Sequence, residues 1–177
     1  MNRYGFAVSM GDVASEAGLS RGSVYRHFGD RESLVQAVLV RTADQFLEAV
    51  AAKVDRKRTL AAQVAEAITV VAAKARRLPA SSSPGGAGRR ETPLALVLRR
   101  DGAAMGERWL AFWAERLDAA RLRGEVRDDL DGRAAAEWLA RVLLSFVAVP
   151  ELDVDPADAR AVRRFVDDHL LHGLAAA

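Results

Sequence analysis

Residues 9–31, SMGDVASEAGLSRGSVYRHFGDR, carry the pattern that most constrains the fold of this chain. Apolar residues recur at helical spacing before and after Gly18, which predicts two short helices. A glycine can adopt the left-handed conformation that ends a helix at little energetic cost. The small Ala14, the turn Gly18 and the β-branched Val24 have the spacing of a helix-turn-helix. We therefore expect the second helix to enter the major groove of DNA.

The helix ends in this segment have capping residues. Ser9 is expected to cap the first helix, with Asp12 completing a capping box, and Ser20 is expected to cap the second. Leu19 is predicted to fill the core beneath the turn, and Phe28 to face inward with Val24. An ordinary helical hairpin is the structural alternative, which the polar residues on the outer face disfavour.

The run AxxAGLSxGxxYxHFxxRExLxxAV resembles the DNA-binding segment of the TetR-type family of bacterial transcriptional repressors. It contains Ala14, Ala17, Gly18, Leu19, Ser20, Gly22, Tyr25, His27, Phe28, Arg31, Glu32, Leu34, Ala37 and Val38. The resemblance covers about a quarter of the chain. It implies an all-α protein with an N-terminal helix-turn-helix domain and a C-terminal helical domain for ligand binding and dimerisation, with no enzymatic activity and no cofactor.

The predicted DNA contacts surround the second helix. Arg21 is placed to donate to guanine O6 and N7, Gly22 to let the backbone approach, and Ser23 to bond a base or a phosphate. The resemblance implies phosphate and sugar contacts for Tyr25 and His27. Arg31 is expected to hold a phosphate with the amides at the start of the third helix. The predicted set also includes Ser9, Ser20 and Arg26.

Composition limits the class of protein. The chain has 177 residues, no cysteine and a net charge of +2, and the excess of positive charge lies in residues 1–58. Disulfides, thiolate metal sites and cysteine nucleophiles are therefore excluded. No segment reaches the roughly 20 apolar residues that span a bilayer, and no signal pattern begins the chain, so we expect a cytoplasmic protein without a membrane partner.

Periodicity predicts two domains, residues 1–53 and 54–177. A long helix from Asp30 to about Lys53 is expected to leave the first domain as a lever. Further helices are predicted from Thr59 to about Leu78, over 92–100, over 105–123, over 132–149, and from Asp155 to 171. Residues 79–91, rich in Ser, Gly and Pro, are predicted to form a flexible loop, either inert or a lid over a cavity.

The C-terminal helices supply the predicted ligand and dimer surfaces. An aromatic wall for a small apolar or aromatic effector is expected from Met105, Trp109, Phe112, Trp113 and Trp138. A homodimer interface, which the resemblance places on the last two helices, is expected from Ala135, Leu139, Val142, Phe146, Val162, Phe165 and Val166. Each aromatic residue also fits an ordinary core position. A homodimer would bind a pseudo-palindromic operator in double-stranded DNA.

Two features leave alternatives open. The resembled family has a helix before the helix-turn-helix, of which only residues 2–6 remain here, so Val13, Val24 and Phe28 are expected to be underpacked. The alternative function is then a ligand-binding or interaction module that has lost DNA binding through N-terminal truncation. His169 and His172 have the spacing of a metal pair, but no further ligand clusters with them, so a surface tail and no metal site are predicted.

Overall fold

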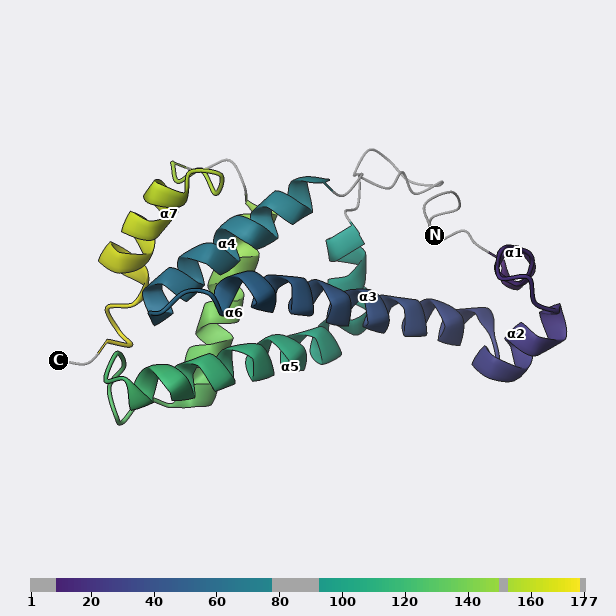
Figure 1. Cartoon of the computed structure of the whole chain (residues 1–177), viewed down its shortest axis with the longest axis horizontal. Coiled ribbons are helices and arrows are strands. Elements are labelled where there is room, and N and C mark those ends of the chain that lie inside the picture. Colours follow the sequence, from purple (N-terminus) through teal and green to yellow (C-terminus); the bar gives the residue numbers. More distant parts are fainter. Residues whose placement is uncertain (1–8, 78–92, 150–152, 176–177) are drawn as a thin grey trace. The chain divides into compact units, whose positions relative to one another are not determined.

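The computed structural model describes residues 9–77, 93–149 and 153–175 (Figure 1). These residues form helices joined by turns, with an isolated bridge between Val126 and Ala175, which confirms the all-α prediction. The elements are α1 (Met10–Glu16), α2 (Arg21–Phe28), α3 (Arg31–Val54), α4 (Leu60–Arg77), α5 (Pro93–Leu122), α6 (Gly132–Ala148), α7 (Ala159–Phe165) and the π-helical turn η2 (Val166–Leu170).

The chain divides into two compact units, residues 1–46 and 47–177. The division falls inside α3, which continues without a break from one unit to the other. The boundary expected from the sequence, 53/54, falls at the end of α3, whereas the two compact units divide between Phe46 and Leu47. A single helix therefore belongs to both units.

Local capping fixes α1 in the first unit. The Ser9 hydroxyl accepts from the Asp12 amide at 3.1 Å, and the Asp12 carboxylate accepts from the Ser9 amide at 2.9 Å, so the predicted capping box is present. Gly18, with φ of 65°, then ends the helix. The Leu19 amide donates to the Ala14 carbonyl at 2.8 Å, which satisfies one of the carbonyls left over at the helix end.

The turn does not bury Leu19, contrary to the sequence prediction. Its side chain is 55% exposed and lies outside the hydrophobic cluster of this unit. The core of the unit is instead formed by Met10, Ala14, Val24 and Leu34, with Val13, Phe28 and Val38 packed at its edge. Of the three residues expected to be underpacked, Val24 is buried, and Val13 and Phe28 are partly buried at the edge of this core.

The second unit contains α4–α7, η2 and the end of α3. The predicted bounds of α4 and α6 agree with the structure to within about a residue. The Asp131 carboxylate accepts from the Arg133 and Ala134 amides at 3.0 and 3.1 Å, which confirms Asp131 as the cap of α6. Gly124, with φ of 70°, follows α5 as predicted.

Two helix predictions in this unit were wrong. The expected separate helices at 92–100 and 105–123 are one continuous helix, α5. Gly102 between them lowers helix propensity by only about 1 kcal/mol, and no proline or cap separates the segments. The last helix begins at Ala159 rather than at Asp155, because Asp158 supplies the cap by accepting from the Arg160 and Ala161 amides.

The final turns of the chain leave the α-helical pattern. The Leu171 amide donates to the Val166 carbonyl at 3.3 Å, five residues back, as a π-helix requires. The predicted loop 79–91 lies outside the described residues. Within the described ranges, no helix combines the length and apolarity needed to cross a membrane.

Candidate nucleic-acid interface

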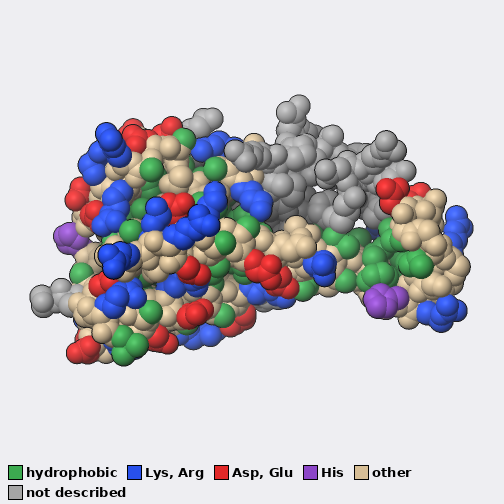
Figure 2. All heavy atoms as spheres, viewed as in Figure 1, with side chains coloured by type: hydrophobic (Ala, Val, Ile, Leu, Met, Phe, Trp, Pro, Cys, Tyr) green, Lys and Arg blue, Asp and Glu red, His purple; other side chains and the backbone are tan. Residues whose placement is uncertain are grey.

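The predicted DNA contacts lie at the surface of the first unit. Ser23 is half-buried, and the others are exposed: Ser9, Ser20, Arg21, Gly22, Tyr25, Arg26, His27 and Arg31. Figure 2 shows Lys, Arg and His side chains, together with acidic side chains, at the surface of the unit that holds α1 and α2. The geometry of the first unit therefore leaves these polar groups accessible to a partner.

Hydrogen bonds organise the first turns of α2. The Ser20 hydroxyl accepts from the Ser23 amide at 3.1 Å and lies 2.9 Å from the Ser23 hydroxyl. Arg26 Nη2 donates to the Ser23 hydroxyl at 3.1 Å. Ser20, Ser23 and Arg26 thus form one connected polar row along α2, which limits their rotamers before any partner binds.

Gly22 is not required by the packing of the chain itself. A Cβ atom built there would meet only the Ser20 hydroxyl, at an ordinary 3.8 Å, and the residue does not have a positive φ. Glycine lowers helix stability by up to about 1 kcal/mol relative to alanine. An exposed helical glycine without an internal role is typical of a surface that another molecule approaches closely.

The C-terminal part of α2 presents rings to solvent. Tyr25 is 51% exposed, and the His27 ring makes an edge contact with Phe28, with centroids 4.6 Å apart. Because Phe28 packs against the core of the unit, this contact fixes the His27 ring at the surface. Gly29, with φ of 78°, then turns the chain into α3.

The start of α3 is capped by a carboxylate. Asp30 Oδ1 accepts from the Ser33 amide at 2.8 Å, and this bond holds the pKa of Asp30 below its ordinary value. The Ser33 amide is therefore already occupied, and a negative charge stands next to Arg31. Any phosphate held by Arg31 would have to share this helix end with Asp30.

The predicted effector residues do not form one group. Met105, Trp109, Phe112 and Trp113 are buried on α5, where edge contacts join Trp109 to Phe112 at 5.3 Å and Phe112 to Trp113 at 5.0 Å between ring centroids. Trp138 is 49% exposed on α6.

Sequence reasoning missed Arg116, which is buried in the second unit. It lies one turn beyond the α5 aromatic residues, with its guanidinium 3.6 Å from the Phe112 ring centroid. Its position on a helix gave no sequence signal beyond a spacing of four from Phe112.

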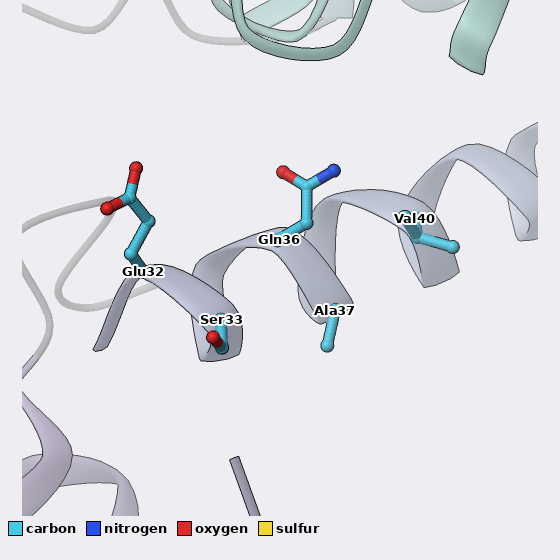
Figure 3. Close-up of a pocket in the computed structure, with 5 residues that line it drawn as sticks. All are labelled: Glu32, Ser33, Gln36, Ala37 and Val40. Atoms are coloured by element: carbon cyan, nitrogen blue, oxygen red, sulfur yellow. The ribbon is translucent and has the colours of Figure 1, made fainter. Parts of the chain in front are cut away.

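A hollow of about 480 Å³ lies beside α3 in the first unit (Figure 3). It is open, and one face of the helix lines it, through Glu32, Ser33, Gln36, Ala37 and Val40. None of the predicted effector residues lines this hollow. Its openness distinguishes it from the enclosed apolar sites that bury small ligands.

The predicted dimer residues divide into two sets. Ala135, Leu139, Val162 and Val166 are buried in the core of the chain itself. Val142, Phe146 and Phe165 are half-buried, and the rings of Phe146 and Phe165 make an edge contact at 5.5 Å. In the described part of the chain, no three His, Cys, Asp or Glu side chains gather as metal ligands, and His169 and His172 are exposed.

Comparison with known proteins supports the interpretation of the first unit. Residues 1–38 match the family model of the bacterial regulatory proteins of the tetR family. The HTH-type transcriptional regulator AlkX of Mycobacterium tuberculosis is 41% identical over 49 residues, which cover 28% of this chain and 23% of that regulator. The sequence match is therefore confined to less than a quarter of the curated relative.

Solved structures extend the likeness of fold over the whole chain. The TetR family repressor AlkX of Dietzia sp. has a TM-score of 0.62 at 24% identity, covering 95% of this chain and 89% of that one. FadR of Bacillus subtilis, solved with stearoyl-CoA, has a TM-score of 0.59 at 18% identity, with coverages of 96% and 91%. The N-terminal segment of this chain is thus similar to the bacterial regulatory proteins of the tetR family, and the fold of the chain is similar to that of solved TetR-family structures.

Proposed function

We propose that this protein is a ligand-responsive transcriptional repressor that binds a pseudo-palindromic DNA operator as a homodimer. The observation that carries the proposal is the geometry of α1, the Gly18 turn and α2, which leaves the N-terminal turn of α2 polar, capped and exposed. In a helix-turn-helix this turn supplies the contacts with base edges.

The residues of α2 have distinct roles in this proposal. Arg21 donates to a guanine, Gly22 allows close approach, and Ser23 bonds a base or a phosphate. Tyr25 and His27 contact the phosphate backbone from the exposed side of α2. Arg31 contributes a phosphate contact, weakened by the neighbouring Asp30 carboxylate.

The dimer in this proposal forms through the exposed part of α6 and α7. Trp138, Val142 and Phe146 recur along α6 at spacings of four, Val149 follows the end of the helix, and each is at least partly exposed. Phe165 extends this apolar surface onto α7 through its contact with Phe146. The buried Ala135, Leu139, Val162 and Val166 support the two helices from behind, so they act on the dimer only indirectly.

The effector in this proposal is a small, mainly apolar molecule held near the α5 aromatic residues. Two buried donors one turn apart, Trp113 Nε1 and Arg116 Nε, have no hydrogen-bond partner among the described residues. An acceptor atom on the effector would satisfy them. The structural neighbours add a chemical class: FadR was solved with stearoyl-CoA, and the Dietzia repressor is implicated in n-alkane degradation.

Selection from a pool of random duplexes tests this function directly. The proposal expects the full chain to enrich related duplexes, and expects some members of a panel of fatty acids, acyl-CoAs and alkanes to release them. Coupling energies between two sites are typically about 1–3 kcal/mol, so release should correspond to a roughly five- to 150-fold loss of affinity. A folded dimer that enriches no duplex would contradict the proposal and would leave a ligand-binding or interaction module.

A further inference from the structure

The side chain of Arg21 lies directly on the backbone of Gly11. A Cβ atom built on Gly11 would stand 2.7 Å from Arg21 Nη2, 2.9 Å from Nε and 3.0 Å from Cζ. All three distances are at or below the limit that real Cβ contacts respect. A side chain at this position on α1 would therefore require the Arg21 guanidinium, the end of a flexible and exposed side chain, to move.

Nothing else in the described structure requires a glycine at position 11. Gly11 lies inside α1 and does not have the positive φ found at Gly18, Gly29 and Gly124. Alanine is the better helix former, so a glycine here weakens α1. The close approach of the Arg21 guanidinium is the steric feature that the missing side chain permits.

The Arg21 side chain is exposed beside α1. Within the described residues, Arg21 makes no hydrogen bond and no ion pair, so its donors stay available. The neighbouring Asp12 carboxylate attracts it, although hydrogen bonds from Ser9 are the main cause of the lowered pKa of Asp12. A long, flexible side chain thus lies against the backbone of Gly11 and near a negative charge, and no described residue occupies its donors.

We infer that Gly11 is a positioning residue for DNA recognition, because it provides the space in which the Arg21 guanidinium is placed for its contact with a base. This inference rests on the proposed function. It differs from a direct role for Gly11, in which the glycine would merely let the DNA backbone approach α1. The two roles differ in whether the effect of a side chain at position 11 depends on Arg21.

A double-mutant cycle separates the two roles. The variants are Gly11→Ala, Arg21→Ala and the double substitution, with Gly106→Ala as the matched control because a Cβ there meets no atom within 4 Å. Affinity is measured for a duplex enriched by the wild-type chain and for its single base-pair variants. Gly11→Ala should reduce the discrimination between them about tenfold, within the range of one bidentate base contact, while Gly106→Ala leaves it unchanged.

The two substitutions should not be additive. In the Arg21→Ala background, Gly11→Ala should cause no further loss, because the group that it displaces is absent. If the double variant instead shows the product of the two single losses of discrimination, the positioning role is overturned, and Gly11 contacts DNA directly. Thermal melting accompanies the cycle, and Gly11→Ala should melt no lower than the wild type because alanine favours the helix.

An NMR measurement without DNA keeps this inference distinct from the proposed function. In the wild-type chain, the Arg21 side chain should show nuclear Overhauser contacts with the Gly11 Hα protons, and the variant Gly11→Ala should lack contacts between Arg21 and the Hα proton at position 11. Absence of the contacts in the wild type would overturn the placement of Arg21. If the contacts are present but no duplex is enriched, the proposed function fails, and the role of Gly11 in recognition fails with it.

Discussion

The guanidinium of Arg116 donates to the carboxylate of Asp55 at 2.6 Å, joining α5 to the residue that follows α3. The two ends of this ion pair differ in environment, because Arg116 is 7% exposed whereas more than half of the Asp55 side chain is exposed. Arg116 also donates to the Phe112 carbonyl at 2.6 Å and lies against the Phe112 ring. A buried positive charge in the second unit is thus neutralised by a carboxylate at its surface.

Removal of this carboxylate should destabilise the second unit. Asp55→Ala leaves Arg116 buried without its counter-charge, so we expect the free energy of unfolding to fall by about 1–3 kcal/mol. Urea denaturation measures the change. The control is Glu115→Ala, which removes a more distant and far more exposed carboxylate, 4.0 Å from Arg116, and should change stability by less than about 0.5 kcal/mol. Equal effects would argue against a structural role for the Asp55 pair.

Substitution of Arg21 and of Arg31 should have different effects on DNA binding, because Arg21 is proposed to contact a base and Arg31 a phosphate. Arg21→Ala should reduce discrimination against single base-pair changes by about 1–3 kcal/mol. Arg31→Ala should weaken all duplexes alike and should reduce the salt slope by about one unit. Fluorescence anisotropy over a range of salt concentrations measures both. The same loss on specific and on random DNA for both variants would contradict the assignment.

Asp30 provides a further check on the start of α3. Asp30→Asn keeps a cap for the Ser33 amide but removes the charge beside Arg31. We expect tighter binding to every duplex, because a phosphate at this helix end would no longer be repelled. Anisotropy at low salt should show this gain most clearly, and an unchanged affinity would place the phosphate elsewhere.

Glu125 should make the stability of the second unit depend on pH. Its carboxylate accepts from the Leu60 amide at 2.5 Å and from Arg123 Nε at 2.6 Å. Burial alone would raise the pKa of Glu125, but these hydrogen bonds outweigh it and lower the pKa. Its contribution to stability is therefore fully present above the unfolded-state pKa, about 4.3, and is lost as the pH falls through the lower folded-state pKa.

The substitution Glu125→Gln isolates this charge, because an amide oxygen can still accept from Leu60. At pH 7 we expect a loss of about 1–2 kcal/mol in unfolding free energy. Below about pH 4 the difference from the wild type should shrink. Glu107→Gln, at an exposed ion pair with Arg133, serves as the control and should change stability by less than about 0.5 kcal/mol. A difference that is constant from pH 7 to pH 3 would rule out the charge as its source.

The exposed surface of α6 should control self-association. Trp138→Glu places a charge on the proposed dimer surface without opening the core, since the side chain is already half exposed. We expect the dimer dissociation constant to rise at least about tenfold in sedimentation experiments, because a charge would be buried unpaired. Leu122→Glu, at an apolar residue that is 90% exposed on α5, should leave association unchanged. If Trp138→Glu and Leu122→Glu both form dimers with the dissociation constant of the wild type, the interface does not include Trp138.

The features predicted from the sequence are those fixed by neighbours in the chain. The caps at Ser9, Ser20 and Asp131 bond amides two or three residues away, so side-chain type and spacing predict them. The ending of α1 at Gly18 follows from the backbone freedom of glycine in the same way.

The features that the sequence did not predict depend on distant partners or on weak local preferences. Arg116 and Asp55 are 61 residues apart, and Leu60 and Glu125 are 65 apart, so no local pattern indicates either contact. Hydrophobicity predicted a buried Leu19, but its side chain is exposed in the turn between α1 and α2. The predicted dimer interface also combined buried and exposed residues of α6. Alanines and large apolar residues occur on both faces of this helix, so the sequence pattern did not distinguish the two faces.

The most direct test of the account is a footprint of the full chain on a duplex enriched by selection. Two copies should protect two half-sites related by a two-fold axis, with centres one helical turn of about 10–10.5 base pairs apart or a multiple of it. Arg21→Ala should weaken protection of both half-sites equally. A single unsymmetrical half-site, or protection that does not depend on Arg21, would contradict the account.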